Sequence, residues 1–343
     1  MRRSRQKFSP LGRVSSVQNG ALDLESGKLK PHDPNDMFLG VADVAWSDQP
    51  EPTACQTWLD YITRVVPDNA ERRMLQSFLG YSLTDWINDH FLMVIGGNGA
   101  GKSTLINAIS KVMGSLACHF SADIMMKRLA FAAELQKGAS LETATVNLLT
   151  GDDVITGNFM RQNDLTYRRT HKTILFGNHR PNFGDGITRR LALLAVKSIP
   201  EKEHDLGLTE KLAAPDVKSA ILHWMVEGLA LFIQDGRKLV LPASVKARNE
   251  EAFDHDDPLS EFLEELNVVN DSNAVLPASK VYNAFLYHCS RSGRKQISQR
   301  ALTQKLIERG WPKPAPKRVA GQVVRAFEGK ALAPSARGGL KLL

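Results

Sequence analysis

A glycine-rich segment with the spacing of a phosphate-binding loop runs from Gly96 to Ser103. It reads GGNGAGKS, matches G-x-x-x-x-G-K-S, follows the apolar run Phe91–Ile95 and precedes a helix predicted over 102–113. In such loops backbone N–H groups surround the phosphates, the lysine reaches the β- and γ-phosphates, and the hydroxyl is a ligand of Mg²⁺. We therefore predict ATP and Mg²⁺ as cofactors, Ser103 as a metal ligand, and ATP-binding residues Gly96, Gly97, Asn98, Gly99, Ala100, Gly101, Lys102, Ser103 and Thr104.

Three further polar features follow the loop along the chain. A short apolar run ends in Glu134, a second is followed by Asn178, and the pair Arg189-Arg190 precedes a third. A carboxylate, an amide and an arginine at the ends of buried strands can act on water and phosphate. Each also has an ordinary structural interpretation: an exposed glutamate, an asparagine in a turn, and a solvated arginine.

The loop, acid, asparagine and arginine pair, in this order, resemble the superfamily 3 helicases. The similarity is to the helicase half of the phage and plasmid primase family and of the poxvirus primase-helicase. It extends upstream over VQNGALDLESGKLKPHDP and LQSFLGYSLTD, and downstream over ILHWMVEGLALFIQDGRKLVLPASV and DDPLSEFLEEL, which are similar to the family's lid and linker. The chain departs from the family at Ala100, where asparagine is usual, and near Asn147, where lysine is usual.

The resemblance implies a role for each of these residues. Glu134 falls on the Walker B carboxylate that polarises the attacking water, and Asn178 on the sensor that orients this water at the γ-phosphate. Arg190 falls on the arginine finger, with Arg189 as the next candidate, and such a finger stabilises charge on the transferred phosphoryl group across a subunit boundary. With Lys102, these residues form the predicted catalytic set. The family also implies a homo-oligomeric ring, most often a hexamer, with the ATP site between subunits.

Cations and aromatic rings alternate between the acid and the asparagine. In related helicases this region forms a hairpin that projects into a central channel. Cations follow phosphates and rings stack on bases, so the region is predicted to bind single-stranded DNA. An ordinary solvated hairpin is the alternative. The predicted contacts are Arg161, Arg168, Arg169 and Lys172, interleaved with Phe159 and Tyr167.

The predicted fold class is α/β, with an AAA+-type P-loop ATPase core, a helical N-terminal part and a C-terminal winged-helix domain. Short strands and turns, with Asn-Gly at 19–20, are expected over 14–50, and a helix pair follows, the second helix opening at Asp68. The tail is expected to form helices over 278–290 and 298–309 and strands over 322–327 and 339–343. The domain borders are predicted as 1–85, 86–255 and 258–343.

Composition places the 343-residue chain among soluble globular proteins, with 43% hydrophobic and 24% charged residues. It excludes collagen-like, disordered and disulfide-scaffold classes. No segment approaches the roughly 18 apolar residues of a membrane span, and the basic N-terminus is not followed by the apolar stretch of a secretory signal. Cys55, Cys118 and Cys289 are too widely spaced for a zinc site. We expect no membrane partner and a location in the reducing cytoplasm of a bacterial host.

Positive charge is concentrated in the tail. Residues 291–343 carry 13 basic and two acidic side chains within a chain whose net charge is +7. The preceding residues are therefore mildly acidic, with a net charge of −4 (+7 − 11). This asymmetry favours contact between the tail and duplex DNA over a merely solvated tail.

The expected function is that of an ATP-dependent DNA helicase or translocase in the replication of a phage, prophage or plasmid. The chain begins too late to hold the family's primase domain, so primer synthesis is not expected of it. The main alternative is an initiator or remnant that binds ATP and DNA without unwinding. A transporter-type or kinase-type ATPase is a further alternative, and the missing LSGGQ-like signature and the basic tail disfavour it.

Overall fold

The computed structural model divides the chain into two compact units, residues 1–251 and 252–343, and each is considered by itself. No helix in the part of the chain that the structure describes has the length and apolar character needed to cross a membrane. The described residues are 13–119, 124, 127–133, 140–141, 146, 150–151, 154–157, 165–178, 181–183, 187–200, 202, 205, 207–254, 258–292, 296–319 and 321–332.

The first unit opens with a small antiparallel sheet of β1 (Val14–Val17), β2 (Gly20–Asp23) and β3 (Leu29–Lys30). As expected, a turn lies at this point: Gln18 and Asn19 join the first two strands, and Gly20 begins β2. A 3-10 helix, η1 (Pro34–Asp36), follows.

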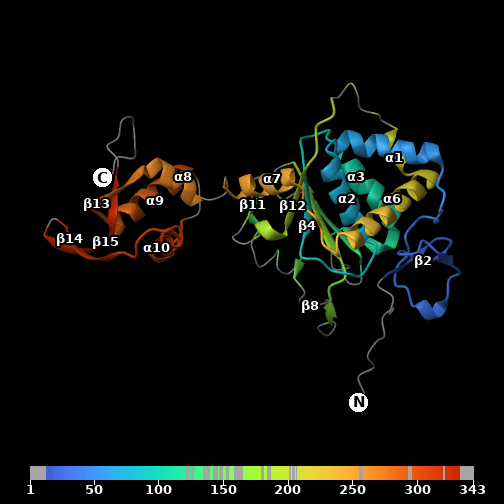
Figure 1. Ribbon diagram of the computed structural model, residues 1–343, viewed down its shortest axis with the longest axis horizontal. Coiled ribbons are helices and arrows are strands. Elements are labelled where there is room, and N and C mark those ends of the chain that lie inside the picture. Colours follow the sequence, from blue (N-terminus) through green and yellow to red (C-terminus); the bar gives the residue numbers. More distant parts are fainter. Residues whose placement is uncertain are drawn as a thin grey trace, which may run out of the picture. The chain divides into compact units, whose positions relative to one another are not determined.

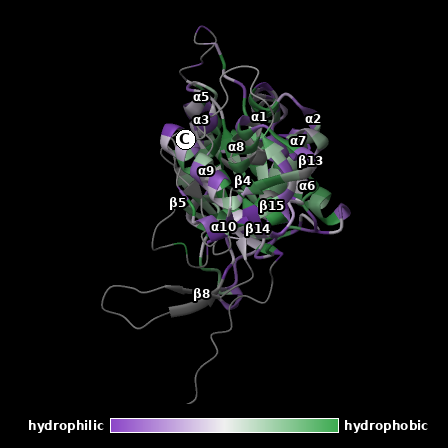
Figure 2. Ribbon diagram, turned by 90° about the vertical axis from the view of Figure 1, so that its left-hand side faces the viewer, coloured by the Kyte–Doolittle hydropathy of each residue, from purple (hydrophilic) through white to green (hydrophobic). Residues whose placement is uncertain are grey.

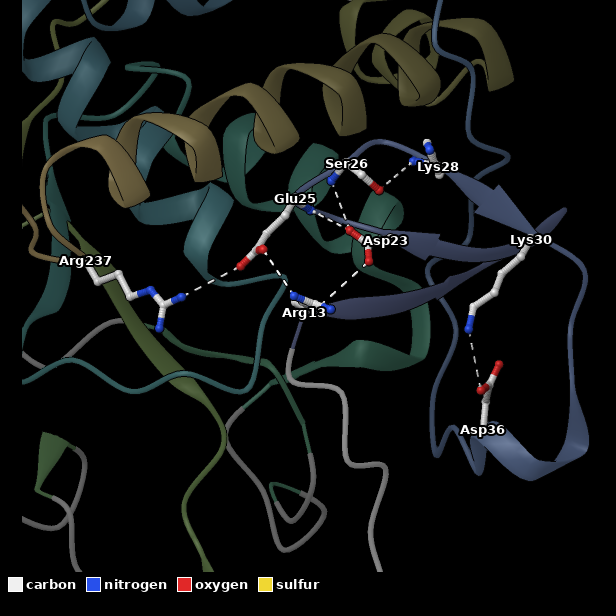
Figure 3. Close-up of polar contacts among 8 residues, drawn as sticks. All are labelled: Arg13, Asp23, Glu25, Ser26, Lys28, Lys30, Asp36 and Arg237. Atoms are coloured by element: carbon white, nitrogen blue, oxygen red, sulfur yellow. Dashed lines mark hydrogen bonds and ion pairs between the residues drawn. The ribbon is translucent and has the colours of Figure 1, made fainter.

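Glu25, in the turn after β2, pairs with two arginines that are distant in sequence (Figure 3). Arg13 lies 3.4 Å from one oxygen of its carboxylate, and Arg237 lies 3.7 Å from the other. Arg237 lies over the Trp86 ring at 4.1 Å. The N-terminal strands are thus attached to the main core, and the segment before residue 86 shares that core.

Two helices precede the glycine loop, as the sequence predicts. Helix α1 (Pro52–Val65) has proline in its first turn, where no intrahelical N–H partner is needed. Helix α2 (Asn69–Tyr81) is capped by Asp68, whose carboxylate accepts from the Glu71 N–H at 2.8 Å.

A five-stranded parallel sheet forms the centre of the unit. Its strand order is β12–β4–β10–β6–β5, and its bounds are β4 (Phe91–Ile95), β5 (Ala117–His119), β6 (Leu129–Ala133), β10 (Lys172–Gly177) and β12 (Leu191–Ala195). Strands β4 and β12 are continuous apolar runs because both faces of the sheet are covered, and residues 174–176 of β10 are apolar as well. Strand β4 is coloured as hydrophobic in Figure 2. The predicted apolar runs are confirmed as strands.

Helices α3 (Lys102–Met113), α5 (Leu208–Leu212) and α6 (Pro215–Gln234) pack with α1 and α2 over this sheet (Figure 1). Helices α2 and α6 approach so closely that a Cβ on Gly80 would lie 2.1 Å from the Leu229 nitrogen. A Cβ on Gly228 would lie 2.0 Å from the Gln76 carbonyl oxygen. These two glycines set the distance between the helices.

Helix α7 (Ala243–Asp254) covers the edge strand β12. The Asn249 amide donates to the Leu191 carbonyl at 2.6 Å and its oxygen accepts from the Leu193 N–H at 3.3 Å. Arg248 donates to the Leu193 carbonyl at 2.8 Å and pairs with Glu71 at 2.8 Å. Side chains thus satisfy backbone groups that an open sheet edge would leave unpaired.

Shorter elements complete the first unit. The parallel pair β7 (Ser140–Leu141) and β11 (Asn182–Phe183) and the antiparallel pair β8 (Val154–Gly157) and β9 (Leu165–Arg168) stand apart from the main sheet. Two 3-10 helices, η2 (Gly114–Leu116) and η4 (Thr188–Arg190), precede β5 and β12.

In its described residues, the second unit combines helices α8, α9 and α10 with an antiparallel sheet of order β13–β15–β14. Its core includes Phe262, Phe285, Phe327 and Trp311. Both predicted helices and the strand over 322–327 are confirmed, whereas α8, β13 and β14 were not expected and the strand predicted over 339–343 lies outside the described residues. The elements are α8 (Pro258–Leu266), β13 (Val268–Pro277), α9 (Ala278–Ser292), α10 (Gln299–Glu308), β14 (Ala315–Val319) and β15 (Gln322–Leu332).

Replacing Gly228 by alanine should destabilise the protein, because the new Cβ would force α2 and α6 apart. Overpacking costs about 1–3 kcal/mol, which outweighs the gain of up to about 1 kcal/mol from alanine in a helix. Urea unfolding of the full chain measures the loss. Gly207→Ala is the matched control: its Cβ would meet nothing nearer than 3.5 Å, so its stability should stay within about 0.5 kcal/mol of the parent. Equal stability of the two variants would contradict the close helix contact.

Candidate nucleotide site

The glycine loop lies at the carboxyl end of β4 and leads directly into α3. Gly99 and Gly101 have φ of 73° and 80°, in the left-handed region that glycine adopts without strain. The loop borders a cavity of about 240 Å³. Its lining is Asn98, Gly99, Ala100, Gly101, Lys102, Ser103, Thr104, Phe176 and Asn178.

The first two glycines of the loop pack closely against the segment that follows β12. A Cβ on Gly96 would lie 2.7 Å from the Val196 carbonyl oxygen, and one on Gly97 would lie 2.9 Å from the Ser198 hydroxyl. Real Cβ atoms do not approach backbone oxygen this closely, so the segment after β12 requires glycine at 96. The loop therefore packs closely against the segment that follows the neighbouring strand β12.

Lys102 and Asn178, which are 76 residues apart in sequence, meet in this cavity. The Lys102 ammonium donates to the Asn178 Oδ1 at 2.8 Å and to the carbonyls of Gly96 and Gly97 at 2.7 and 2.8 Å. Strand β10 pairs in parallel with β4, so Asn178, directly after β10, lies at the same edge of the sheet as the loop. The structure thus brings together two members of the predicted catalytic set.

Tyr61 of α1 supports the loop and was not expected from the sequence. Its hydroxyl donates to the Gly101 carbonyl at 2.9 Å, and a Cβ on Gly101 would lie 3.1 Å from Val65. Burial raises the pKa of Tyr61 well above its ordinary value, which keeps the hydroxyl a neutral donor. Helical periodicity assigns Tyr61 to the core, but nothing local indicates its contact with a loop 40 residues away.

Groups that could hold a metal ion are described only in part. Ser103 stands in the first turn of α3 and lines the cavity, where a hydroxyl ligand of Mg²⁺ is needed. Glu134 lies outside the described residues; strand β6 before it ends at Ala133 and pairs in parallel with β10. Among the described side chains, no three His, Cys, Asp or Glu form a group that could bind a metal.

Arg190 lies at the opposite edge of the sheet from the loop of its own chain. It immediately precedes β12, whose first residue, Leu191, pairs with Phe91 at the start of β4, whereas the loop follows the end of β4. Five strand residues separate the two edges, a span of roughly 16 Å. The half-buried Arg190 side chain donates to the Thr150 hydroxyl at 2.8 Å, and Arg189 is exposed.

The predicted hairpin is formed, but its cations have different environments. Strands β8 and β9 pair from Val154–Arg168 to Gly157–Leu165. Arg161 lies outside the described residues, and for Arg168 only the backbone is described. Neither side chain is therefore placed.

Arg169 and Lys172 are buried, which corrects the prediction that they bind DNA. Their exposed fractions are 2% and 0%. Arg169 donates to the carbonyls of Thr150, Gly151 and His171 at 2.8, 2.9 and 3.0 Å, and Lys172 donates to the carbonyl of Thr84. Cations fixed by backbone carbonyls inside the fold cannot reach a phosphate, so these two side chains have a structural role.

These cations belong to a buried cluster at the amino edge of β6 and β10. Burial lowers the pKa of Lys172 well below its usual value, and neighbouring Arg128 lowers it further. Burial, with the charges of Arg169 and Lys172, lowers the pKa of His171 to about 3. No hydrogen-bond partner for either ring nitrogen of His171 occurs among the described residues. His171 is therefore a neutral ring at neutral pH.

Family models match both ends of the chain. Residues 13–67 match the model described as D5 N terminal like, and residues 254–317 match Poxvirus D5 protein-like. No curated protein matches the chain.

Solved structures of the C-terminal region of NrS-1 have a similar fold. The apo structure of NrS-1 residues 305–718 has a TM-score of 0.55 at 11% identity and covers 84% of this chain and 77% of that one. An A-form apo structure has a TM-score of 0.52, also at 11% identity, with 84% and 78% covered. At this identity the similarity concerns the fold alone.

These matches confirm the predicted resemblance at two places: segments on both sides of the glycine loop are similar to D5-type proteins. The mixed α/β fold with its five-stranded parallel sheet is consistent with a P-loop-like core.

Acid should destabilise the protein through His171. Its folded-state pKa of about 3 lies below the ordinary 6.5, so the unfolded chain binds a proton that the folded state excludes as pH falls below 6.5. The stability present above pH 6.5 is then lost, by about 2 kcal/mol at pH 5. His171→Leu has no titratable ring at this position. Its free energy of unfolding, measured with urea, should therefore fall between pH 7.5 and pH 5 by about 2 kcal/mol less than that of the parent. An unchanged pH dependence would mean that the ring takes up protons within the fold.

Proposed function

We propose that the protein is an ATP-dependent DNA helicase or translocase that works as a homo-oligomeric ring, with each ATP site completed by the neighbouring subunit. The observation that carries this proposal is the contact between Lys102 and Asn178 in the cavity of the glycine loop. A loop lysine and a strand-end amide side by side are what hydrolysis of a phosphoanhydride requires: one holds the phosphates and the other orients water.

When ATP binds, the Lys102 ammonium would give up its present hydrogen-bond acceptors and donate to phosphate oxygens instead. Its ammonium donates to carbonyls of the loop, and γ-phosphate oxygens are stronger acceptors because they carry charge. On that exchange Asn178 Oδ1 would become available to accept from the attacking water. The N-terminus of α3 adds positive potential at the same place.

Magnesium would be held by the Ser103 hydroxyl together with phosphate oxygens, and it would neutralise charge on the phosphates. The carboxylate assigned to polarise water is Glu134, the residue that follows β6 in the sequence, and β6 pairs with β10. These roles follow from the resemblance and from the shared edge of parallel strands.

Arg190 supports assembly of the site in trans. It lies at the amino edge of the sheet, roughly 16 Å from the loop of its own chain, which is beyond the reach of an arginine side chain. A neighbouring subunit could present its Arg190 to this loop. This arrangement favours a ring, for which a hexamer is the expected size.

Two surfaces would contact DNA. The β8–β9 hairpin would bring Arg161 and Arg168 to single-stranded DNA in a central channel. In the second unit, three helices and a three-stranded antiparallel sheet support a winged-helix module that binds duplex DNA. Register pairs Arg318 with Val323 on one face of the β14–β15 hairpin, next to Arg325, and all three are exposed. The context would be replication of a phage, prophage or plasmid in the cytoplasm of a bacterial host.

ATPase activity measured with and without single-stranded DNA tests the proposal. The parent should hydrolyse ATP faster with DNA, and Lys102→Ala should abolish turnover because the loop loses its phosphate-binding cation. Lys111→Ala, an exposed lysine on the same helix, is the matched control and should retain the parent rate. A parent that binds ATP and DNA without hydrolysis would favour the alternative, an initiator or remnant that does not unwind.

Mixed rings test completion of the site in trans. Arg190→Ala and Lys102→Ala should each be inactive alone, since loss of such an arginine removes roughly 10³–10⁵ in rate in related phosphoryl-transfer systems. Mixing the two gives some interfaces with an intact loop facing an intact finger, and these should recover part of the activity. No recovery in rings shown to be mixed would rule out the trans assignment.

A further inference from the structure

Thr150 holds the side chain of Arg190 through a hydroxyl of fixed orientation. The hydroxyl, in a side chain that is 1% exposed, lies 2.7 Å from the Val146 carbonyl and 2.8 Å from the Arg190 Nη1. A threonine hydroxyl has one proton, and here the carbonyl can only accept it. A lone pair of the hydroxyl therefore faces the guanidinium, which can only donate.

The backbone of Thr150 is fixed as well. Its carbonyl accepts from Arg169 Nη2 at 2.8 Å, and the next carbonyl, of Gly151, accepts from Arg169 Nε at 2.9 Å. Arg169 directly follows β9, and β8 starts three residues after Gly151, so one planar guanidinium joins the two ends of the hairpin base. Both the backbone and the hydroxyl of Thr150 are thereby held from two sides.

We propose that Thr150 is the positioning residue of Arg190, which fixes the orientation of the arginine's guanidinium group. The inference deepens the proposed function and rests on it. Ordering an arginine side chain costs conformational entropy. If Thr150 already holds Arg190 in its own subunit, less of this entropy is lost when Arg190 binds the phosphates of a neighbouring subunit. Displacement of a reacting group by about 1 Å can cost about 10²-fold in rate.

Two substitutions at Thr150 separate the hydroxyl from the space it fills. Thr150→Val keeps the shape and removes the acceptor, whereas Thr150→Ser keeps the acceptor. In the full chain with single-stranded DNA, Thr150→Val should lower kcat by about 10–10²-fold and leave the KM for ATP within about twofold. Thr150→Ser should retain kcat within about threefold. Thermal unfolding of both variants identifies any general loss of stability.

The ATPase activity of mixed rings distinguishes a positioning role of Thr150 from a general effect on the stability of its own subunit. Thr150→Val subunits keep an intact loop, and Lys102→Ala subunits keep a correctly held Arg190. Mixed rings should therefore exceed the summed activity of the separate variants. If Thr150→Val instead damages the ATP site of its own subunit, mixing cannot restore it, and the positioning role is overturned.

The outcomes also separate this inference from the proposed function. Equal kcat for Thr150→Val and a DNA-stimulated parent overturns the positioning role and leaves the proposed function intact. A drop in Thr150→Ser as large as that in Thr150→Val overturns it too, because the hydroxyl would then not be the cause. A parent without any ATPase activity removes the proposed function, and the positioning role with it.

Discussion

Parallel pairing of β4 with β10 on one side and β12 on the other determines where the candidate catalytic groups lie. The register aligns Gly177 of β10 with Ile95 of β4, so the residues that follow these strands, Asn178 and the glycine loop, share one edge. The same register aligns the first residue of β12 with the first residue of β4, which leaves Arg190 at the other edge. One pattern of backbone hydrogen bonds thus places Asn178 and the glycine loop at one edge of the sheet and Arg190 at the other.

Close packing keeps this sheet in place. Because residues 80 and 228 are glycines, the backbones of α2 and α6 lie so close together that no Cβ atom would fit between them at these positions. Gly96 likewise lets the loop pack against the segment after β12. Side chains of α7 satisfy the open edge of β12. Tyr61 then fixes the Gly101 carbonyl from α1, so the loop is supported by elements from both ends of the first unit.

Among the described residues, some basic side chains are buried and others are exposed to solvent. Arg169 and Lys172 are enclosed near the amino edge of the sheet, where backbone carbonyls take the place of water around their charges. Arg318 and Arg325 lie exposed on a short hairpin of the second unit. The family matches at residues 13–67 and 254–317 fall on either side of the glycine loop. The candidate site between them is therefore identified from its own motif and contacts and not from a family match.

The sequence by itself determined the features that are encoded locally. Unbroken apolar runs predicted β4, β10 and β12, an aspartate and a glutamate three residues apart predicted the start of α2, and the glycine spacing predicted the loop. Only the tertiary structure decided which arginines and lysines are buried, because the partners of Arg169 and Lys172 include carbonyls at positions 150 and 84, distant in sequence. It likewise decided that Tyr61 supports the loop and that Thr150 holds Arg190, since these contacts join segments 40 residues apart. Charge and periodicity describe one residue and its near neighbours, whereas burial depends on which distant backbone groups the fold brings alongside.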